Sequence, residues 1–350
     1  MSHPTDMPAP AVSVVIPVHN CERYVAEAVR SVLRQTRTDF ELIVVDDGST
    51  DGTAEIVSSF ADPRIRLIRT PRGGISSAIN AGISASRADL IARLDGDDAM
   101  EPERLQRQVD FLEARPWLGG GASYYWVMDE KGTLRGSEEP PLVTVADLEL
   151  QLSHRGRLIY PHPTVMMRRH VLARVGGYDS RYDKCEDVEL FMRMYEAGWP
   201  MLVQPERLTR FRVHASSTTA SSVRVQYFLN EAIFANFRRR RRGDADLPVE
   251  HYMAAAHASP WRWLITEGRI LSRRLQRMRT VALMADRRLA GTLALVAAAA
   301  VDPISTTGAL RRKLKRIERQ SLSPWRAEAP APIASGVAGP AVTGPETTSV

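Results

Sequence analysis

The chain has 350 residues, of which 44% are hydrophobic and 25% charged, and its formal net charge is +6. A chain of this length and composition can bury a substantial core, which excludes a wholly disordered or fibrous protein. Its two cysteines, Cys21 and Cys185, are too few for a disulfide framework and fit a reducing compartment.

Short apolar runs alternate with helical patterns through the first hundred residues. Strands are predicted at residues 12–16, 40–45 and 65–68, and a fourth begins at Leu90. Between them lie a helix with an apolar face from Val25 to Leu33, a helix over residues 53–60, and a helix carrying Ile75, Ile79 and Ile83. This alternation predicts an α/β protein with a mainly parallel, helix-covered sheet.

Polar loops follow three of these predicted strands, at residues 17–20, 46–49 and 95–98. Ligands bind outside the carboxyl ends of the strands in open α/β sheets, so the three loops are expected to line one crevice. Asp95, Asp97 and Asp98 are crowded carboxylates, and a divalent cation such as Mg²⁺ or Mn²⁺ stabilises such a cluster. The alternative is an acidic loop whose aspartates cap the helix that begins near Pro102.

The second part of the chain is less regular. A helix is predicted after Pro102, an aromatic strand through residues 124–126, an irregular passage from Pro140, and an extended run over residues 160–167. Glu186 and Asp187 open a further helix, where acids also favour the helix macrodipole. A late strand over residues 208–213 brings His214 to its end.

Beyond Ser222 the pattern changes to long basic helices, and we place a domain boundary there. The predicted division is a tail at residues 1–11, a catalytic domain at 12–222, a basic helical extension at 223–320, and a disordered tail at 321–350. The arginine run at residues 238–242 fits a solvated helix end, a nucleic-acid contact or a contact with anionic lipid. Residues 1–10 lack the pattern of a signal peptide, and residues 289–301 are too short for a confident membrane span.

Neither the GxGxxG dinucleotide fingerprint nor the GxxxxGK[ST] phosphate loop occurs in the sequence. The segments that do occur are VVIPVHN at 14–20, FELIVVDDGS at 40–49, AINAG at 78–82, IARLDGDD at 91–98, and GGYD at 176–179 with Glu186 and Asp187. In this order they resemble the motifs of a family 2 glycosyltransferase of the GT-A fold, over roughly residues 12–220.

The resemblance implies a role for each matching residue. Pro17 and Asp47 are expected at the nucleobase pocket, Asp95 beside the ribose and phosphates, and Asp97 at the metal. Asp187 is expected to be the general base with Glu186 as its partner. His214 is a candidate third metal ligand, since imidazole binds Mn²⁺.

The predicted function is therefore inverting transfer of a sugar from a nucleotide-diphosphate donor to a glycan or lipid-linked acceptor, in cell-surface polysaccharide synthesis, with Mn²⁺ or Mg²⁺. We expect a cytoplasmic protein with peripheral contact to the anionic inner face of the membrane, and no nucleic-acid partner. The alternatives are a sugar-phosphate nucleotidyltransferase and a basic nucleic-acid-binding protein. The first normally has a glycine-rich signature where residues 17–20 stand here, and the second leaves the acidic loops unexplained.

Overall fold

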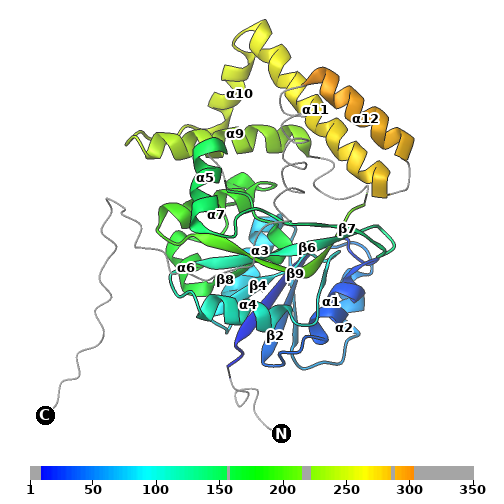
Figure 1. The fold of residues 1–350 in the computed structure, drawn as a ribbon. Helices are drawn as coiled ribbons and strands as arrows, with labels where there is room; N and C mark the ends of the chain where they lie inside the picture. Colours follow the sequence, from blue (N-terminus) through cyan, green and yellow to red (C-terminus); the bar gives the residue numbers. More distant parts are fainter. Residues whose placement is uncertain (1–8, 156–157, 215–221, 285–287, 303–350) are drawn as a thin grey trace, which may run out of the picture.

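The computed structural model describes residues 9–155, 158–214, 222–284 and 288–302. These residues form a nine-stranded sheet flanked by helices, with further helices packed above it (Figure 1).

The first four strands form a parallel half-sheet in the order β3-β2-β1-β4. They are β1 (Val12–Val18), β2 (Phe40–Asp47), β3 (Ile65–Thr70) and β4 (Leu90–Arg93). The connecting helices are α1 (Val25–Leu33), α2 (Thr53–Ser58) and α3 (Ile75–Ala85). Every residue of β1 and β2 is buried, as expected for parallel strands covered on both faces. The predicted βαβ arrangement is confirmed, and the carboxyl ends of β1, β2 and β4 lie at one edge.

Beyond β4 the sheet is mixed. Its remaining strands are β5 (Ala99–Met100), β6 (Gly120–Met128), β7 (Leu134–Glu138), β8 (Met166–Arg168) and β9 (Met201–Arg212). Strand β8 lies antiparallel between β4 and β6, and β9 runs parallel to β6 but antiparallel to β5. The parallel pattern predicted from the first strands therefore ends at β4, because β8 enters the sheet in the opposite direction.

Four helices accompany this half: α4 (Arg104–Glu113), α5 (Val145–Arg155), α6 (Arg169–Val175) and α7 (Glu186–Glu196), with short 3₁₀ turns at His162–Thr164 and Ser180–Tyr182. Helix α5 lies in the passage predicted to be irregular. A capping box explains it: the Asp147 amide donates to Thr144 Oγ1 at 3.1 Å, and the Thr144 amide donates to Asp147 Oδ2 at 3.0 Å.

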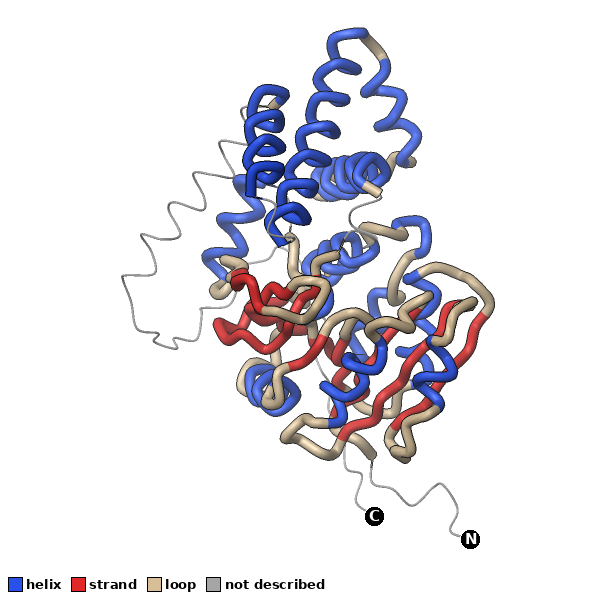
Figure 2. The backbone as a smooth tube through the Cα atoms, turned by 90° about the vertical axis from the view of Figure 1, so that its right-hand side faces the viewer, coloured by secondary structure: helices blue, strands red, loops and turns tan. Residues whose placement is uncertain are grey.

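The C-terminal helices are α9 (Val223–Arg240), α10 (Val249–His257), α11 (Pro260–Met284) and α12 (Arg288–Val301). Leu229, Ile233, Phe234 and Phe237 of α9 are buried in the main hydrophobic core, so this helix is packed onto the sheet domain. Helices α11 and α12 lie side by side as a hairpin (Figures 1 and 2). No helix among the described residues is long and apolar enough to cross a membrane. The disordered tail predicted from residue 321 lies outside the described residues.

Candidate active site

The three aspartates after β4 lie together. One carboxylate oxygen from each of Asp95, Asp97 and Asp98 falls within 4.8 Å of the other two. They reach the carboxyl edge of the sheet because β4 ends at Arg93 and the chain turns before the two-residue strand β5. The predicted acidic cluster is therefore a compact group of oxygen ligands, which is the donor set that Mg²⁺ and Mn²⁺ prefer.

Asp95 forms a bidentate ion pair with Arg93, with nitrogen to oxygen distances of 2.6 and 2.5 Å. The Arg93 side chain is only 2% exposed, so this positive charge lies beneath the crevice. Burial raises the pKa of Asp95, and repulsion from Asp97 adds to the rise, although Arg93 acts in the opposite direction. The sequence analysis included Arg93 in a motif but assigned it no role. The pattern that could have indicated its role is an arginine at the end of an otherwise apolar strand, shortly before the aspartates.

Asp98 is 1% exposed and ties the cluster to β9. Its Oδ1 accepts a hydrogen bond from the Arg212 amide at 2.7 Å, whereas its Oδ2 is buried without a hydrogen-bond partner among the described residues. Burial, followed by repulsion from Asp97 and Asp95, raises its pKa well above the usual range. A buried carboxylate oxygen without a donor beside two further acids is the electrostatic environment that a divalent cation would stabilise. The donor set therefore fits a metal.

Asp97 and His214, the two predicted metal ligands, are brought together by the fold. The His214 Nε2 atom lies 2.8 Å from Asp97 Oδ2. Helix α1 supports the imidazole, whose ring centroid is 5.2 Å from that of Tyr24. The late strand β9 thus delivers His214 to the aspartates, as its position in the sequence predicted.

Arg212 links the loop of Asp97 to helix α1 through its side chain. Its side chain donates to the carbonyl oxygen of Asp97 at 2.7 Å and to Glu27 Oε2 of α1 at 2.5 Å. It is buried at the last position of β9, between the aspartate loop and the turn that follows β6. No local pattern predicts this role of Arg212, because its partners come from three separate segments.

Glu186 and Asp187 open α7, as predicted. The Lys184 amide donates to Glu186 Oε2 at 2.7 Å, and Asp187 Oδ1 accepts the Val188 amide at 2.8 Å. Burial, followed by repulsion from Asp187, raises the pKa of Glu186 to about 8. Burial raises the pKa of Asp187 to about 6, while the Val188 amide and Arg93 oppose that rise. Burial and the repulsion between the two carboxylates therefore favour a single proton on the pair near neutral pH.

His162 and Tyr178 form the wall behind this acid pair. His162 Nε2 lies 2.8 Å from the Tyr178 hydroxyl, and its Nδ1 lies 3.7 Å from Glu186 Oε1. Burial, with a smaller contribution from Arg93, lowers the pKa of His162 well below its usual value, so the imidazole is neutral. Arg93 also acts on the pKa values of Glu186 and Asp187, which places this guanidinium between the acid pair and the aspartate cluster.

The predicted nucleobase residues lie at the other end of the crevice. Pro17 is buried in β1, beside Val45 of β2. The Asp47 carboxylate accepts hydrogen bonds from the amides of Gly73 at 2.7 Å and Gly74 at 3.0 Å, and from the Arg72 guanidinium at 2.9 Å. Asp47 therefore orders the loop before α3.

Two long-range contacts join this loop to the approach to α7. The Ser76 hydroxyl donates to Asp183, and a Cβ atom at Gly74 would lie 2.1 Å from Asp183 Oδ2. Because Gly74 also has a φ of 88°, only glycine fits there without strain. The Asn80 side chain pairs with both backbone groups of Tyr178, at 2.8 and 2.9 Å. Asp183 and Asn80 are positioning residues for which sequence reasoning assigned no role.

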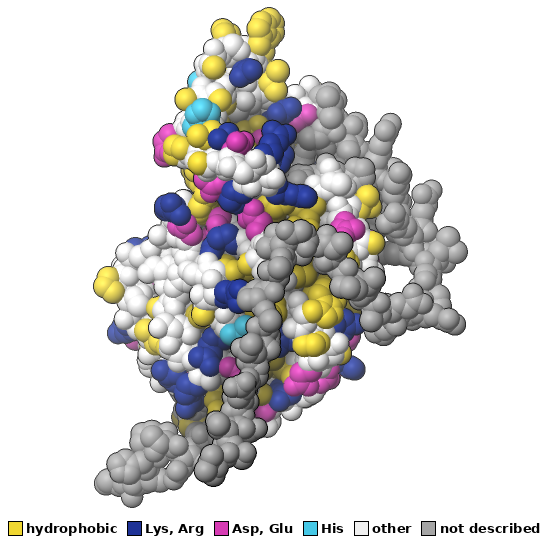
Figure 3. Space-filling model, turned by 90° about the vertical axis from the view of Figure 1, so that its left-hand side faces the viewer, with side chains coloured by type: hydrophobic (Ala, Val, Ile, Leu, Met, Phe, Trp, Pro, Cys, Tyr) yellow, Lys and Arg dark blue, Asp and Glu magenta, His cyan; other side chains and the backbone are white. Residues whose placement is uncertain are grey.

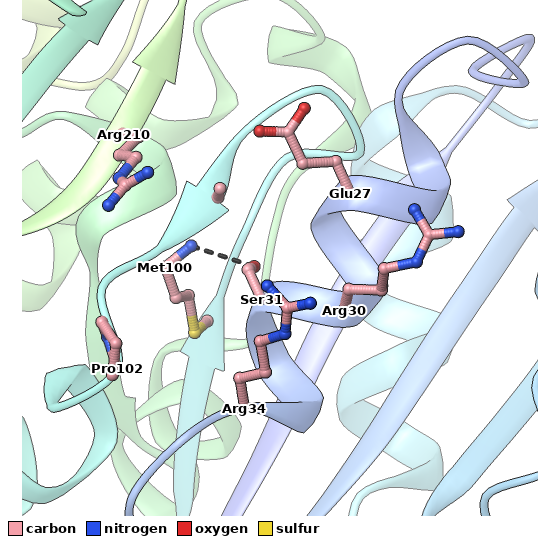
Figure 4. Close-up of a pocket in the computed structure, with 8 residues that line it drawn as sticks. Glu27, Arg30, Ser31, Arg34, Met100, Pro102 and Arg210 are labelled. Atoms are coloured by element: carbon pink, nitrogen blue, oxygen red, sulfur yellow. Dashed lines mark hydrogen bonds between the residues drawn. The ribbon is translucent and has the colours of Figure 1, made fainter.

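A separate pocket of about 350 Å³ lies between α1 and β5 (Figure 4). It is lined by Glu27, Arg30, Ser31, Arg34, Ala99, Met100, Pro102 and Arg210. The Met100 amide donates to Ser31 Oγ at 3.0 Å across it, the bond drawn as a dashed line in Figure 4. None of the predicted site residues lines this pocket, so it is distinct from the acidic crevice.

Comparison with known proteins identifies the family. The profile described as Glycosyl transferase family 2 matches residues 13–176. The putative glycosyltransferase EpsE of Bacillus subtilis is 34% identical over 253 residues, which cover 71% of this chain and 87% of EpsE. Chondroitin synthase of Pasteurella multocida is 41% identical over 99 residues, which cover 28% of this chain but only 10% of that enzyme.

Two solved structures share the fold. The mannosyltransferase PcManGT of Pyrobaculum calidifontis, solved with GDP-Man and Mn²⁺, has a TM-score of 0.52 at 20% identity over 90% of this chain and 82% of its own. TarS 1-349 of S. aureus, solved with UDP-GlcNAc, has a TM-score of 0.50 at 18% identity over 82% of this chain and 90% of its own. The expectation of glycosyl transfer is thus favoured over nucleotidyl transfer. The chain belongs to glycosyl transferase family 2, and its catalytic half has the GT-A fold.

Proposed function

We propose that the protein transfers a sugar from a nucleotide-diphosphate donor to a glycan or lipid-linked acceptor, with inversion at the anomeric carbon. The observation that carries this proposal is that two groups of acids in the site differ in how their charge is held. Asp95, Asp97 and Asp98 gather oxygen ligands at one place, and the pair of Glu186 and Asp187 holds a single proton at another.

The donor phosphates belong at the aspartate cluster. Asp97 and His214 would hold Mn²⁺ or Mg²⁺, with Asp95 beside the ribose and phosphates. A bound cation would supply Lewis-acid chemistry by neutralising the charge that develops on the leaving diphosphate. PcManGT, solved with GDP-Man and Mn²⁺, supports a donor and cation of this class.

The nucleobase belongs between Pro17 and Asp47. The Asp47 Oδ1 atom accepts a hydrogen bond from the Gly73 amide, and a carboxylate oxygen can accept a second. An N–H group of the base would be that second donor. In this proposal Asp47 both orders the loop at residues 72–74 and reads the base.

The reacting acceptor hydroxyl belongs at Asp187. Its oxygen attacks the anomeric carbon as its proton passes to the Asp187 carboxylate, and the bond from that carbon to the diphosphate oxygen breaks. The nucleoside diphosphate leaves with the bonding electrons. Attack on the face opposite the leaving group inverts the centre, so an α-linked donor gives a β-linked product. Glu186, which holds its proton, leaves Asp187 as the base.

The biological setting follows from the relatives. Chondroitin synthase makes a polysaccharide, and its similarity to this chain supports a role in cell-surface polysaccharide synthesis. We propose that the enzyme works in the cytoplasm, peripherally attached to the inner face of the membrane.

Thermal-shift titration of the full chain with UDP- and GDP-sugars, each with and without Mn²⁺, tests the donor assignment. One nucleotide sugar is expected to raise the melting temperature in a Mn²⁺-dependent manner, because a ligand that binds only the folded state stabilises it. Asp97→Asn should shift this Mn²⁺-dependent stabilisation to higher Mn²⁺ concentrations. Equal stabilisation of the wild type and Asp97→Asn with Mn²⁺ would contradict the assignment.

A further inference from the structure

The hairpin of α11 and α12 carries an apolar surface that the sheet domain does not cover. Six large apolar side chains on it, which we call the hairpin face, are between 45% and 76% exposed. They are Leu264, Leu271 and Met278 of α11, and Leu289, Leu293 and Val296 of α12.

The spacing of these residues shows that each set forms a stripe. Leu264, Leu271 and Met278 recur every seven residues, which is close to two helical turns. Leu289, Leu293 and Val296 follow the four- and three-residue steps of a single helix face. Each helix therefore presents one apolar stripe to the outside.

The two stripes lie on the same side of the hairpin. The helices touch where the Ser272 hydroxyl donates to the Ala298 carbonyl at 3.3 Å, and where Gly268 faces Val301, so they run antiparallel. An α-helix turns by about 100° per residue. Measured around each helix axis from these contacts, the stripe lies roughly 80° away on α11 and roughly 140° away on α12. The sense of rotation is the same when each helix is viewed from its N-terminus. In an antiparallel pair, rotation in the same sense brings both stripes to one side.

The opposite flank of α11 packs on the rest of the protein. Ile270 is buried with Tyr227 of α9, and the Arg273 guanidinium lies 4.7 Å from the centroid of that tyrosine ring. Arg277 donates to Gln226 of α9 at 2.6 Å. The hairpin is thus anchored to α9 by one flank, and the hairpin face points away from α9.

Charge around the hairpin face indicates its partner. Helix α11 contains six arginines and one glutamate. Arg273 and Arg277 contact α9, whereas Arg262 and Arg274 are exposed. Residues 289–301 of α12 contain no charged residue. The single glutamate, Glu267, is paired with Arg224. A second copy of this chain would bring exposed arginines close to one another, whereas anionic lipid headgroups attract them.

Tryptophans at the start of α11 favour the same partner. Trp261 is 75% exposed and Trp263 47% exposed, on either side of the exposed Arg262. Hydrophobic side chains gather at this tip of the extension, where α10 and α11 meet (Figure 3). Tryptophan is enriched at the boundary between lipid headgroups and acyl chains, where its ring meets both environments.

We propose that the hairpin face inserts into the interface of an anionic membrane, with the exposed Arg262 and Arg274 of α11 at the headgroups and the helices parallel to the surface. Residues 264–278 of α11 and 289–296 of α12 thus form a monotopic anchor. Such an anchor would hold the enzyme at the membrane, where it could reach a lipid-linked acceptor. Membrane binding itself does not depend on the proposed glycosyl transfer, and only this access to the acceptor rests on it.

The test is flotation of the full chain with vesicles of phosphatidylcholine and phosphatidylglycerol, compared with phosphatidylcholine alone. The wild type should float with the anionic vesicles. A double variant, Leu271→Glu with Leu293→Glu, places one carboxylate on each stripe and should float at least about tenfold less. The matched control, Leu134→Glu with Ile159→Glu, changes two similarly exposed side chains on the sheet domain and should float like the wild type.

Melting temperature and nucleotide-sugar thermal shift should be the same in all three proteins, which separates a lost anchor from a lost fold or a wrong donor. Wild-type protein that does not float, or a hairpin variant that floats as well as the wild type, overturns the proposal. A third result would also overturn it: light scattering shows that the wild type is a dimer and the hairpin variant a monomer, and neither binds vesicles. That result would assign the hairpin face to contact with a second copy of the chain.

Discussion

Two groups of acids share the crevice, and the structure holds their charges in different ways. The cluster of Asp95, Asp97 and Asp98 is balanced by the buried guanidinium of Arg93, and the His214 imidazole lies against Asp97. The pair of Glu186 and Asp187 is balanced by a proton, because the pKa of Glu186 is raised to about 8 and that of Asp187 to about 6. Crowded carboxylates that bind a metal cation can hold phosphates through that cation. In a carboxylate pair that keeps one proton, the ionised carboxylate is available as a base.

The largest expected effect is on the pair. Asp187→Asn removes the proton acceptor without changing the size of the side chain, and should lower the transfer rate by roughly 10²- to 10⁴-fold. Donor affinity, measured by calorimetry, should stay within about twofold, since general-base catalysis acts on the chemical step. A folded variant with wild-type transfer would show that Asp187 is not the base.

Asp97→Asn tests the cluster in the same way. Loss of one anionic ligand should lower transfer by about 10²- to 10³-fold, because less charge on the leaving diphosphate is neutralised. Raising the Mn²⁺ concentration should recover part of the activity. Asp89→Asn, at an exposed acid just before β4, is the control and should behave like the wild type. If Asp97→Asn kept full activity at low Mn²⁺, the metal assignment would fail.

Arg93 is the charge shared by both groups, so its removal tests how far they are linked. Arg93→Met leaves Asp95 without its bidentate partner and should lower the free energy of unfolding by about 3–5 kcal/mol. Arg169→Met breaks the exposed pair with Asp89 and should cost less than about 1 kcal/mol. Urea unfolding of both variants gives the comparison, and similar small losses would mean that Arg93 is not the buried counter-charge.

A smaller effect is expected from Glu186→Gln, which mimics the protonated state. The folded-state pKa of Glu186 is about 8 against an ordinary 4.5, so the native state holds a proton that the unfolded state has released in this interval. Wild-type stability should therefore fall as pH rises from 4.5 to about 8. The variant should lose less stability than the wild type over this range, as measured by urea unfolding. Parallel curves for the two proteins would contradict the raised pKa.

The parallel half of the sheet and its acidic loops could be predicted from the sequence because their signals are local. Residues 12–16 and 40–45 are β-branched runs ended by polar turns, and the order of such segments implies where their carboxyl ends meet. Asp97 and His214 were paired through the resemblance to a family, and the fold then placed them 2.8 Å apart.

The supports of the site could not be predicted, because each depends on contacts between distant segments. Arg212 reaches Glu27 across 185 positions, and Asp183 meets Ser76 across 107. Strand β8 reverses direction within the sheet, which no local period encodes. The glycine at position 74 is visible in the sequence, but the reason for it, the approach of Asp183, is visible only in three dimensions.

The central claim is that the pair of Glu186 and Asp187 keeps one proton and leaves one carboxylate as the base. The pH dependence of kcat/KM tests this claim most directly. For the wild type, kcat/KM should rise with pH through about 6 as Asp187 ionises. Glu186→Gln should keep this acid limb, and Asp187→Asn should lose it along with most of the rate. An acid limb that disappears in Glu186→Gln but persists in Asp187→Asn would assign the base to Glu186 and contradict the account.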